Sequence, residues 1–262
     1  MTMTDWQRAD RPRRRIGRGV EVHTSIGSTN DRARELLDVP GGEGRAVVTE
    51  QQTAGRGRRG RTWISPPGRN LMLSVAVRPQ LAAADAWRLG LAAALAARSA
   101  CAAVAPVALK WPNDVVSDDG AKVGGLLVET TIGGDRVTSA VIGIGINVNW
   151  PRAEMPQQIA GDATSLSELA GVSIDRAELL ATLLDALDAE LLAVESGHSP
   201  LARYRQACAT LGTEVGVETA TGRVEGQAVE IDERGALVIE AAAGRVALTS
   251  GEIVRVRSGA PA

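Results

Sequence analysis

The pattern of apolar and polar positions predicts alternating strands and helices over most of the chain. Strands are expected where apolar residues alternate with polar ones or form short runs between turn residues, at 20–25, 45–51, 70–77, 107–110, 122–131 and 137–148. Helices are expected where apolar residues recur at helical spacing, at 31–38, 85–104, 175–191 and 200–209. Asp175 has the residue type of a helix N-cap. The chain therefore predicts a globular domain with both strands and helices.

The pattern changes at both ends of this region. After residue 211 it contains only short β runs joined by glycine turns, at 215–217, 223–231, 236–240 and 246–256, which predicts a small barrel-like domain. Residues 1–18 carry six arginines without periodicity. We expect a flexible basic tail at 1–18, a main domain at 19–211 and a small domain at 212–262.

The overall composition is that of an ordinary globular protein. The 262 residues are 44% apolar and 23% charged, and the net charge is −2, so any basic patch is local. We find no signal peptide, and the longest apolar stretch, 89–107, is interrupted by Arg98. The two cysteines lack metal-ligand spacing. These features predict a cytoplasmic protein with no membrane segment.

Residues 52–63, named here the arginine–glycine loop, form the most unusual stretch. Arginines 56, 58, 59 and 61 alternate with three glycines, and Trp63 ends the run. Glycine lets backbone N–H groups approach a ligand closely, and guanidinium groups offer forked donors for phosphate or carboxylate. The loop therefore predicts an anion site, and a solvated arginine-rich loop is the alternative.

Part of this loop matches G-x-G-x-x-G, but a dinucleotide site is excluded. That fingerprint requires a helix to begin at the glycines, whereas Pro66 and Pro67 follow here and prevent one. The chain also has no G-x-x-x-x-G-K-[ST] sequence. Neither a Rossmann site nor a P-loop is predicted.

Lysine usage indicates a second candidate feature. Lysine and arginine total 29, yet only Lys110 and Lys122 are lysines. A compact ammonium suits a single phosphate oxygen, although chance can also place two lysines close together. Further along the chain, Gly143 and Gly145 stand beside Asn147 in a predicted strand, where they favour a ligand floor over a bulge.

These features together predict a site for a nucleotide and a second small ligand. Because a P-loop is absent, we favour attack of a carboxylate on the α-phosphate, which yields an acyl-adenylate and pyrophosphate. Cations stabilise the negative charge that develops in such a reaction. A flexible loop that excludes water protects the labile adenylate.

Five ordered motifs then resemble those of the biotin protein ligases. They are Gly27-Ser-Thr-Asn30, the arginine–glycine loop, Lys110-Trp-Pro-Asn-Asp114, Lys122-Val-Gly-Gly125 and Gly143-Ile-Gly-Ile-Asn147. The resemblance runs from about residue 20 to the C-terminus. It implies a ligase that forms biotinyl-5′-AMP from biotin and ATP with Mg²⁺, then transfers biotin to a lysine of a biotin carboxyl carrier protein domain.

The resemblance also implies a fold. It is an α+β fold, a mixed β-sheet flanked by helices, like class II aminoacyl-tRNA synthetases and biotin–lipoyl ligases, with a small C-terminal SH3-like β-barrel. Fewer than twenty residues precede the first predicted strand, too few for the winged helix-turn-helix of some members. We therefore expect a monofunctional ligase that binds no operator DNA.

Site roles follow from the resemblance residue by residue. Biotin binding is expected of Ser28, Thr29, Asn30, Gln52, Arg56, Gly57, Arg58, Lys122, Gly125, Gly143 and Gly145. Contacts with ATP or the adenylate are expected of Arg58, Arg59, Arg61, Trp63, Lys122 and Asn147. Among these, Trp63 is expected to stack on the adenine ring and Asn147 to hydrogen-bond the edge of the adenine. The catalytic candidates are Lys122 first, with Arg56, Lys110 and Asp114. Magnesium ligands stay unassigned.

Two rival functions differ in class. A lipoate ligase or octanoyl transferase shares the fold and has a comparable lysine, but the complete arginine–glycine loop and Lys-Trp-Pro-Asn-Asp argue against it. An RNA-binding protein that uses the arginine–glycine loop is the non-enzymatic rival. Such modules interleave stacking aromatics, whereas this chain has no phenylalanine and Tyr204 as its single tyrosine.

Overall fold

A mixed seven-stranded sheet organises the main domain of the computed structural model, which describes residues 4–220 and 222–254. Its order is β1-β2-β3-β7-β6-β5-β4, with β1 and β2 parallel and the other pairs antiparallel. The strands are β1 (Val20–His23), β2 (Ala46–Thr49), β3 (Leu71–Val77), β4 (Ala108–Lys110), β5 (Asp114–Val116), β6 (Lys122–Gly133) and β7 (Arg136–Ile146). The predicted mixed sheet flanked by helices is confirmed.

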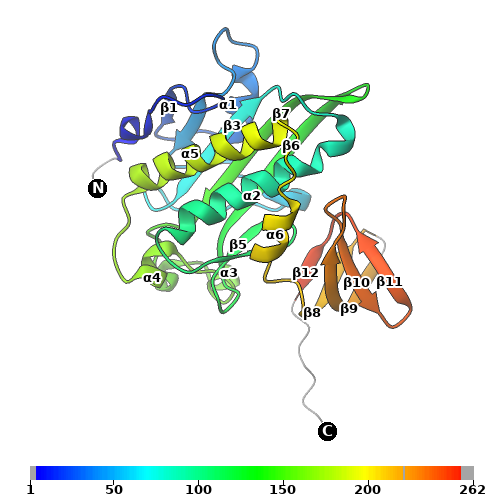
Figure 1. The fold of residues 1–262 in the computed structure, drawn as a ribbon. Coiled ribbons are helices and arrows are strands. Elements are labelled where there is room, and N and C mark those ends of the chain that lie inside the picture. The colour runs from blue at the N-terminus through cyan, green and yellow to red at the C-terminus, as the bar shows by residue number, and fades with distance from the viewer. Residues whose placement is uncertain (1–3, 221, 255–262) are drawn as a thin grey trace.

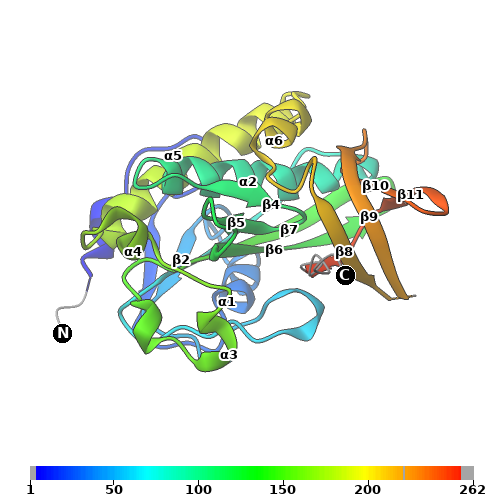
Figure 2. The same ribbon diagram turned by 90° about the horizontal axis from the view of Figure 1, so that it is seen from below.

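Helices cover both faces of this sheet (Figures 1 and 2). One face carries α2 (Trp87–Ala102), α5 (Arg176–Glu195) and α6 (Leu201–Ala207), and the other carries α1 (Thr29–Leu36). The short helices are α3 (Gln157–Ala160), α4 (Leu166–Ala170) and the 3-10 turns η1 (Trp6–Ala9), η2 (Arg58–Gly60), η3 (Ala83–Asp85) and η4 (Arg152–Glu154). In the described part of the chain, none of the helices has the length and apolarity needed to cross a membrane.

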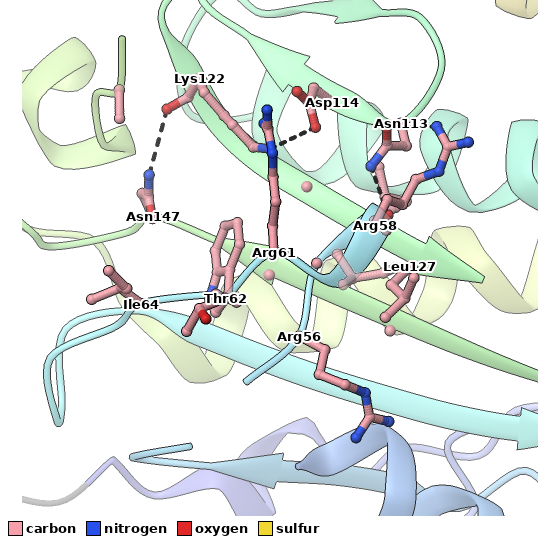
Figure 3. A pocket seen from close by; sticks show the side chains of 18 of the residues that line it. Arg56, Arg58, Arg61, Thr62, Ile64, Asn113, Asp114, Lys122, Leu127 and Asn147 are labelled. Atoms are coloured by element: carbon pink, nitrogen blue, oxygen red, sulfur yellow. Dashed lines mark hydrogen bonds and ion pairs between the residues drawn. The ribbon is translucent and has the colours of Figure 1, made fainter. Parts of the chain in front are cut away.

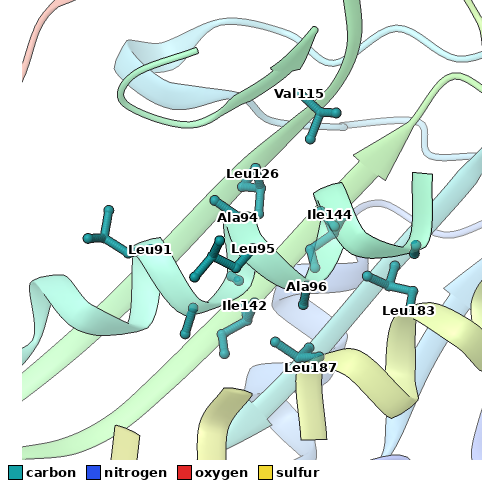
Figure 4. Close-up of a cluster of buried hydrophobic side chains, with 14 of the residues drawn as sticks. Leu91, Ala94, Leu95, Ala96, Val115, Leu126, Ile142, Ile144, Leu183 and Leu187 are labelled. Carbon is teal, nitrogen blue, oxygen red and sulfur yellow. The ribbon is translucent and has the colours of Figure 1, made fainter. Parts of the chain in front are cut away.

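The main core lies between the sheet and the pair α2 and α5 (Figure 4). Asp175 caps α5 as predicted, because its carboxylate accepts from the backbone N–H of Ala177 at 2.9 Å. Leu183 and Leu187 of α5 are fully buried beside the alanine-rich face of α2. Alanine on α2 lets the two helix backbones approach closely, so a leucine helix and an alanine helix complement each other.

Strand alternation separates this core from the opposite face, where the candidate site lies. Ile142, Ile144 and Ile146 of β7 enter the main core, while Gly143 and Gly145 between them face the other way. Successive side chains of a strand point to opposite faces, so the Gly-Ile alternation places bulk toward the helices and space toward the site.

The N-terminal segment is ordered, so the prediction of a flexible tail is wrong for residues 4–18. Trp6 is 1% exposed and Ile16 is fully buried. Arginines of this segment pair with acidic side chains of α5 or its cap, for example Arg8 with Asp175 and Arg13 with Asp185. Residues 1–3 lie outside the described residues.

The C-terminal domain is a five-stranded antiparallel sheet in the order β11-β10-β9-β8-β12. Its strands are β8 (Glu214–Thr219), β9 (Gly222–Ile231), β10 (Leu237–Ala241), β11 (Gly244–Leu248) and β12 (Glu252–Val254). The end strands β11 and β12 do not pair within residues 222–254, so the described sheet is open and the prediction of a barrel is corrected.

Candidate active site

A cavity of about 620 Å³ opens on the glycine face of the sheet. It is bounded by the start of α1, the arginine–glycine loop, the β4–β5 hairpin, β6, β7 and β12. Figure 3 shows part of its lining, with Arg58, Asp114, Lys122 and Asn147 among the labelled side chains. Every residue that the sequence predicted for the site lines it: Ser28, Thr29, Asn30, Gln52, Arg56, Gly57, Arg58, Arg59, Arg61, Trp63, Lys110, Asp114, Lys122, Gly125, Gly143, Gly145 and Asn147. Motifs far apart in the sequence therefore converge on one cavity.

Lys122, the first residue of β6, lines this cavity. Its Nζ lies 2.7 Å from Oδ1 of Asp114 on β5 and 5.8 Å from the centre of the Trp63 ring. The lysine side chain is 36% exposed, so the cation remains accessible from the cavity. An ammonium held between a carboxylate and an aromatic face is fixed in place.

Three arginines of the loop each contact a different part of the protein. Arg58 Nη1 donates to Asn113 Oδ1 at 3.2 Å, and Arg59 Nη1 donates to the carbonyl of Glu218 at 2.8 Å. Arg61 forms an ion pair with Glu252. Burial lowers the pKa of Arg58, although the nearby Asp114 carboxylate opposes this shift. The C-terminal domain thus holds one end of the loop and supplies Glu252 to the cavity wall.

Arg56 lies apart from these cations, although it also lines the cavity. Its two terminal nitrogens donate to Asp31 of α1 at 2.6 Å each, and Figure 3 shows its side chain directed away from Lys122 and Arg58. The hydrogen bonds from Arg56 lower the pKa of Asp31, and those to Asp31 raise the pKa of Arg56. This geometry favours an anchor for the loop and lends no support to the predicted catalytic role of Arg56.

The end of the cavity next to α1 is lined by uncharged polar groups. Gln52 Oε1 accepts from the backbone N–H of Thr29 at 2.8 Å and lies 3.1 Å from its hydroxyl. Ser74 of β3 donates to Asn30 Oδ1 at 2.6 Å and lies 2.7 Å from the Thr29 hydroxyl. Ser74 was not among the predicted site residues, although it is the single hydroxyl inside the apolar strand 71–77.

The two glycines of β7 make room for side chains of the protein itself. A Cβ atom at Gly143 would lie 2.1 Å from Asn30 Oδ1, and one at Gly145 would lie 2.6 Å from Cζ2 of Trp63. Both distances are far below ordinary contact. The expected ligand floor is therefore covered by Asn30 and Trp63, and these side chains present the surface that a ligand meets.

Asn147 uses its amide for contacts within the protein. Its Nδ2 donates to the carbonyl of Lys122 at 3.4 Å (Figure 3). The same nitrogen donates to the carbonyl of Thr164 at 3.1 Å, and Asn147 Oδ1 accepts from Asn70 at 3.4 Å. Asn147 is 5% exposed. The predicted hydrogen bond to an adenine edge thus falls on an amide that is already engaged with Thr164, Lys122 and Asn70.

Comparison with known proteins relates this chain to a family. The Biotin/lipoate A/B protein ligase family matches residues 22–147, and the Biotin protein ligase C terminal domain matches residues 210–256. A Biotin--[acetyl-CoA-carboxylase] ligase of Mycobacterium tuberculosis is 35% identical over 252 residues, which cover 92% of this chain and 90% of that protein. The chain belongs to the biotin protein ligase family.

Further members agree in sequence and in structure. The Bifunctional ligase/repressor BirA of Bacillus subtilis is 34% identical over 91% of this chain and 74% of that protein. The biotin protein ligase from Aquifex aeolicus in complex with biotin and ATP superimposes with a TM-score of 0.74 and 31% identity, covering 90% of this chain and 98% of that one. Family membership therefore rests on both domains.

Proposed function

We infer that this chain is an ATP-dependent biotin protein ligase. In the first step it forms biotinyl-5′-AMP from biotin and ATP, and in the second it transfers biotin to a lysine of a biotin carboxyl carrier domain. The main support is one cavity that combines an uncharged polar end at Thr29 and Gln52 with a cationic region at Lys122 and Arg58. That division matches a ligand with a neutral hydrogen-bonding head and a carboxylate that meets a phosphate.

We propose that the head of biotin binds at the polar end of the cavity. The side chains of Ser28, Thr29, Asn30 and Gln52 offer both donors and acceptors there, as a ureido group requires. Ser28, Thr29 and Asn30 are each at most 5% exposed. Water is thus largely excluded, which strengthens hydrogen bonds to the ligand.

Lys122 and Arg58 serve the first reaction in this proposal. A carboxylate oxygen of biotin attacks the α-phosphorus, a new P–O bond forms, and the bond to pyrophosphate breaks. Negative charge gathers on the phosphate oxygens during this step, and a fixed ammonium stabilises it by about 4 kcal/mol at 4 Å with an effective dielectric constant of about 20. Lys122 pairs with Asp114 and lies beside the Trp63 ring in the cavity wall, so it is the principal catalytic candidate.

Asp114 has two proposed roles, both set by its position beside Lys122. Mg²⁺ binds few protein carboxylates and relies on substrate phosphates, and the Asp114 Oδ1 atom is buried with no hydrogen bond from the described residues beyond its ion pair with Lys122. Asp114 would thus hold the ion next to the phosphates, where the ion neutralises their charge. In the second step the same carboxylate attracts the carrier lysine, whose amine attacks the acyl carbon and releases AMP.

The arginine–glycine loop and the ring of Trp63 complete the proposed adenylate site. Trp63 already lies over Gly145 with one face toward Lys122, so adenine can stack on an aromatic surface that is in place. Arg59 and Arg61 tie the loop to the C-terminal domain, and Arg56 ties it to α1. A loop fastened at both ends keeps water from the adenylate.

Biotin-dependent exchange of labelled pyrophosphate into ATP tests the first step. We expect exchange with biotin and none with lipoate or octanoate. Exchange with lipoate or octanoate in place of biotin would instead identify the lipoate ligase rival. Absence of exchange with all three acids, from folded protein with Mg²⁺, would remove the proposal. Transfer to a purified carrier domain, detected with streptavidin, tests the second step.

A further inference from the structure

A buried charge pair lies where the N-terminal segment meets α5, outside the cavity. Trp6 Nε1 donates to Glu50 Oε1 at 2.8 Å, and Arg176 Nη1 lies 2.8 Å from Glu50 Oε2. The guanidinium carbon of Arg176 also lies 5.0 Å from the centre of the Trp6 ring. Trp6, Glu50 and Arg176 are 1%, 5% and 6% exposed, so the pair is desolvated.

From this pair, hydrogen bonds continue through the interior to the backbone of Lys122. Arg176 Nη1 donates to the carbonyl of Asn70 at 2.9 Å. The Asn70 side chain, which is fully buried, donates from Nδ2 to Asn147 Oδ1 at 3.4 Å. Asn147 Nδ2 in turn donates to the carbonyl of Lys122 at 3.4 Å. Six residues from six separate segments thus form one connected polar chain, which passes from the backbone of Asn70 to its side chain.

Ligand contact does not account for this chain, because Trp6, Glu50, Arg176 and Asn70 do not line the cavity. Stability alone is also a poor explanation. Replacing a buried ion pair by well-packed apolar residues is often neutral or stabilising, since desolvation offsets the attraction between the charges. Among the described residues, Glu50 Oε2 has no hydrogen bond beyond its ion pair with Arg176. The side-chain amides of Asn70 and Asn147 are hydrogen-bonded through both their oxygen and their nitrogen, which fixes one arrangement of the two.

We propose that Asn70, Arg176, Glu50 and Trp6 are positioning residues for Lys122. The inference rests on the proposed function, in which Lys122 is the catalytic cation. The side-chain Nδ2 of Asn70 donates to Oδ1 of Asn147 and thereby fixes the orientation of the Asn147 amide. In this orientation Asn147 Nδ2 donates to the backbone carbonyls of Lys122 and Thr164. The start of β6 is thereby fixed, and with it the root of the Lys122 side chain.

Asn70→Asp tests this step with little change in side-chain size. The carboxylate still accepts from the Val148 N–H, as Asn70 Oδ1 does at 3.1 Å, but it has no donor for Asn147. We expect kcat for biotin-dependent pyrophosphate exchange to fall about 10-fold to 100-fold, because small displacements of a catalytic group have effects of this size. The KM for biotin should stay within about twofold, since the polar end of the cavity is unchanged.

Trp6→Phe tests the far end of the chain, with a matched control nearby. The phenylalanine keeps a ring against Arg176 but removes the indole N–H that donates a hydrogen bond to Glu50. We expect a smaller fall in kcat than for Asn70→Asp. Arg11→Gln breaks an exposed ion pair between the same N-terminal segment and Glu178 of α5. Exposed pairs contribute little, so this control should keep the wild-type kcat.

Lysine NMR provides a readout that does not depend on activity. Lys110 and Lys122 are the two lysines of the chain, so ¹⁵N-lysine labelling gives two side-chain signals, which Lys110→Arg assigns. Asn70→Asp and Trp6→Phe should shift the Lys122 signal and leave the Lys110 signal in place. If the wild type shows no biotin-dependent pyrophosphate exchange, the proposed function fails. The two lysine signals still decide whether the buried hydrogen-bond network positions Lys122.

One combination of results would overturn the proposal. If the variants fold, with cooperative thermal unfolding, and keep both the wild-type kcat and the wild-type Lys122 signal, the buried chain is only structural. Should Asn70→Asp not fold, Trp6→Phe decides alone with the same two measurements.

Discussion

Replacement of Gly143 by alanine is the sharpest test of how the site is built. The added Cβ would lie 2.1 Å from Oδ1 and 3.0 Å from Cγ of Asn30, so one of the two must move. Asn30 is buried and is held from two sides, because Ser74 donates to its Oδ1 at 2.6 Å and its Nδ2 donates to Glu129 at 2.7 Å. The amide cannot move aside without losing at least one of these bonds.

The expected loss of stability follows from these contacts. Overpacking of a tight interior costs about 1–3 kcal/mol. A buried acceptor left without its donor costs about 1–3 kcal/mol more, as for Asn30 Oδ1 without Ser74. We therefore expect Gly143→Ala to lower the free energy of unfolding by about 2–6 kcal/mol. The affinity for biotin should fall at least about tenfold, which corresponds to 1.4 kcal/mol.

Urea unfolding and calorimetric titration with biotin measure the two effects. Gly90→Ala in α2 is the matched control, because nothing lies within 4 Å of its added Cβ and alanine is favoured in a helix by about 0.5–1 kcal/mol. The double variant Gly143→Ala with Asn30→Ala removes the clashing amide, so it should recover part of the stability but not the biotin affinity. Wild-type stability and affinity for Gly143→Ala would refute the reasoning.

Three further predictions concern charged residues. Lys122→Met should reduce pyrophosphate exchange by about 100-fold to 1,000-fold with little change in melting temperature, and near-normal exchange would disprove its catalytic role. Arg58→Gly should open the loop and release biotinyl-AMP, so that added serum albumin becomes biotinylated and is detected on streptavidin blots. The ligase itself should take up little label because it has only two lysines. Albumin labelling no stronger than with the wild-type enzyme would contradict this prediction. Because Arg56 lowers the pKa of Asp31 below its ordinary 3.8, their pair stabilises the fold fully above about pH 4 and loses this contribution as pH falls through the lowered pKa. Arg56→Gln should thus differ from wild type in urea unfolding at pH 6 and converge with it below that pKa, and an equal difference at all pH values would exclude the pair as the cause.

The elements of the sheet could be predicted because their signals are local. Alternation of glycine and isoleucine at 143–146 indicates a strand with one bulky face, and the structure places those faces accordingly. The cavity was predictable for a related reason, since the motifs that line it stand at or beside strand ends. What approaches the glycines was not predictable, because Asn30 and Trp63 come from segments over 80 residues away.

The ordered N-terminal segment escaped prediction because its partners are distant in sequence. Trp6 and its neighbouring arginines show no periodicity of their own. Their order comes from Glu50 and from the acidic side of α5, about 170 residues further along, as between Arg11 and Glu178 or Arg13 and Asp185. The charge of this segment is visible in its local sequence, whereas the acidic residues that pair with it lie far along the chain.

The contacts of the loop arginines within the protein argue against the nucleic-acid rival. A protein that binds phosphate backbones needs cations free to displace counterions. Here the loop arginines already contact protein oxygens, Arg56 at Asp31, Arg59 at Glu218 and Arg61 at Glu252. An RNA strand would have to break these contacts for each phosphate it gained. A small ligand enclosed by the loop needs no such exchange, because Lys122 is accessible from within the cavity, and the arrangement of charge therefore favours the ligase.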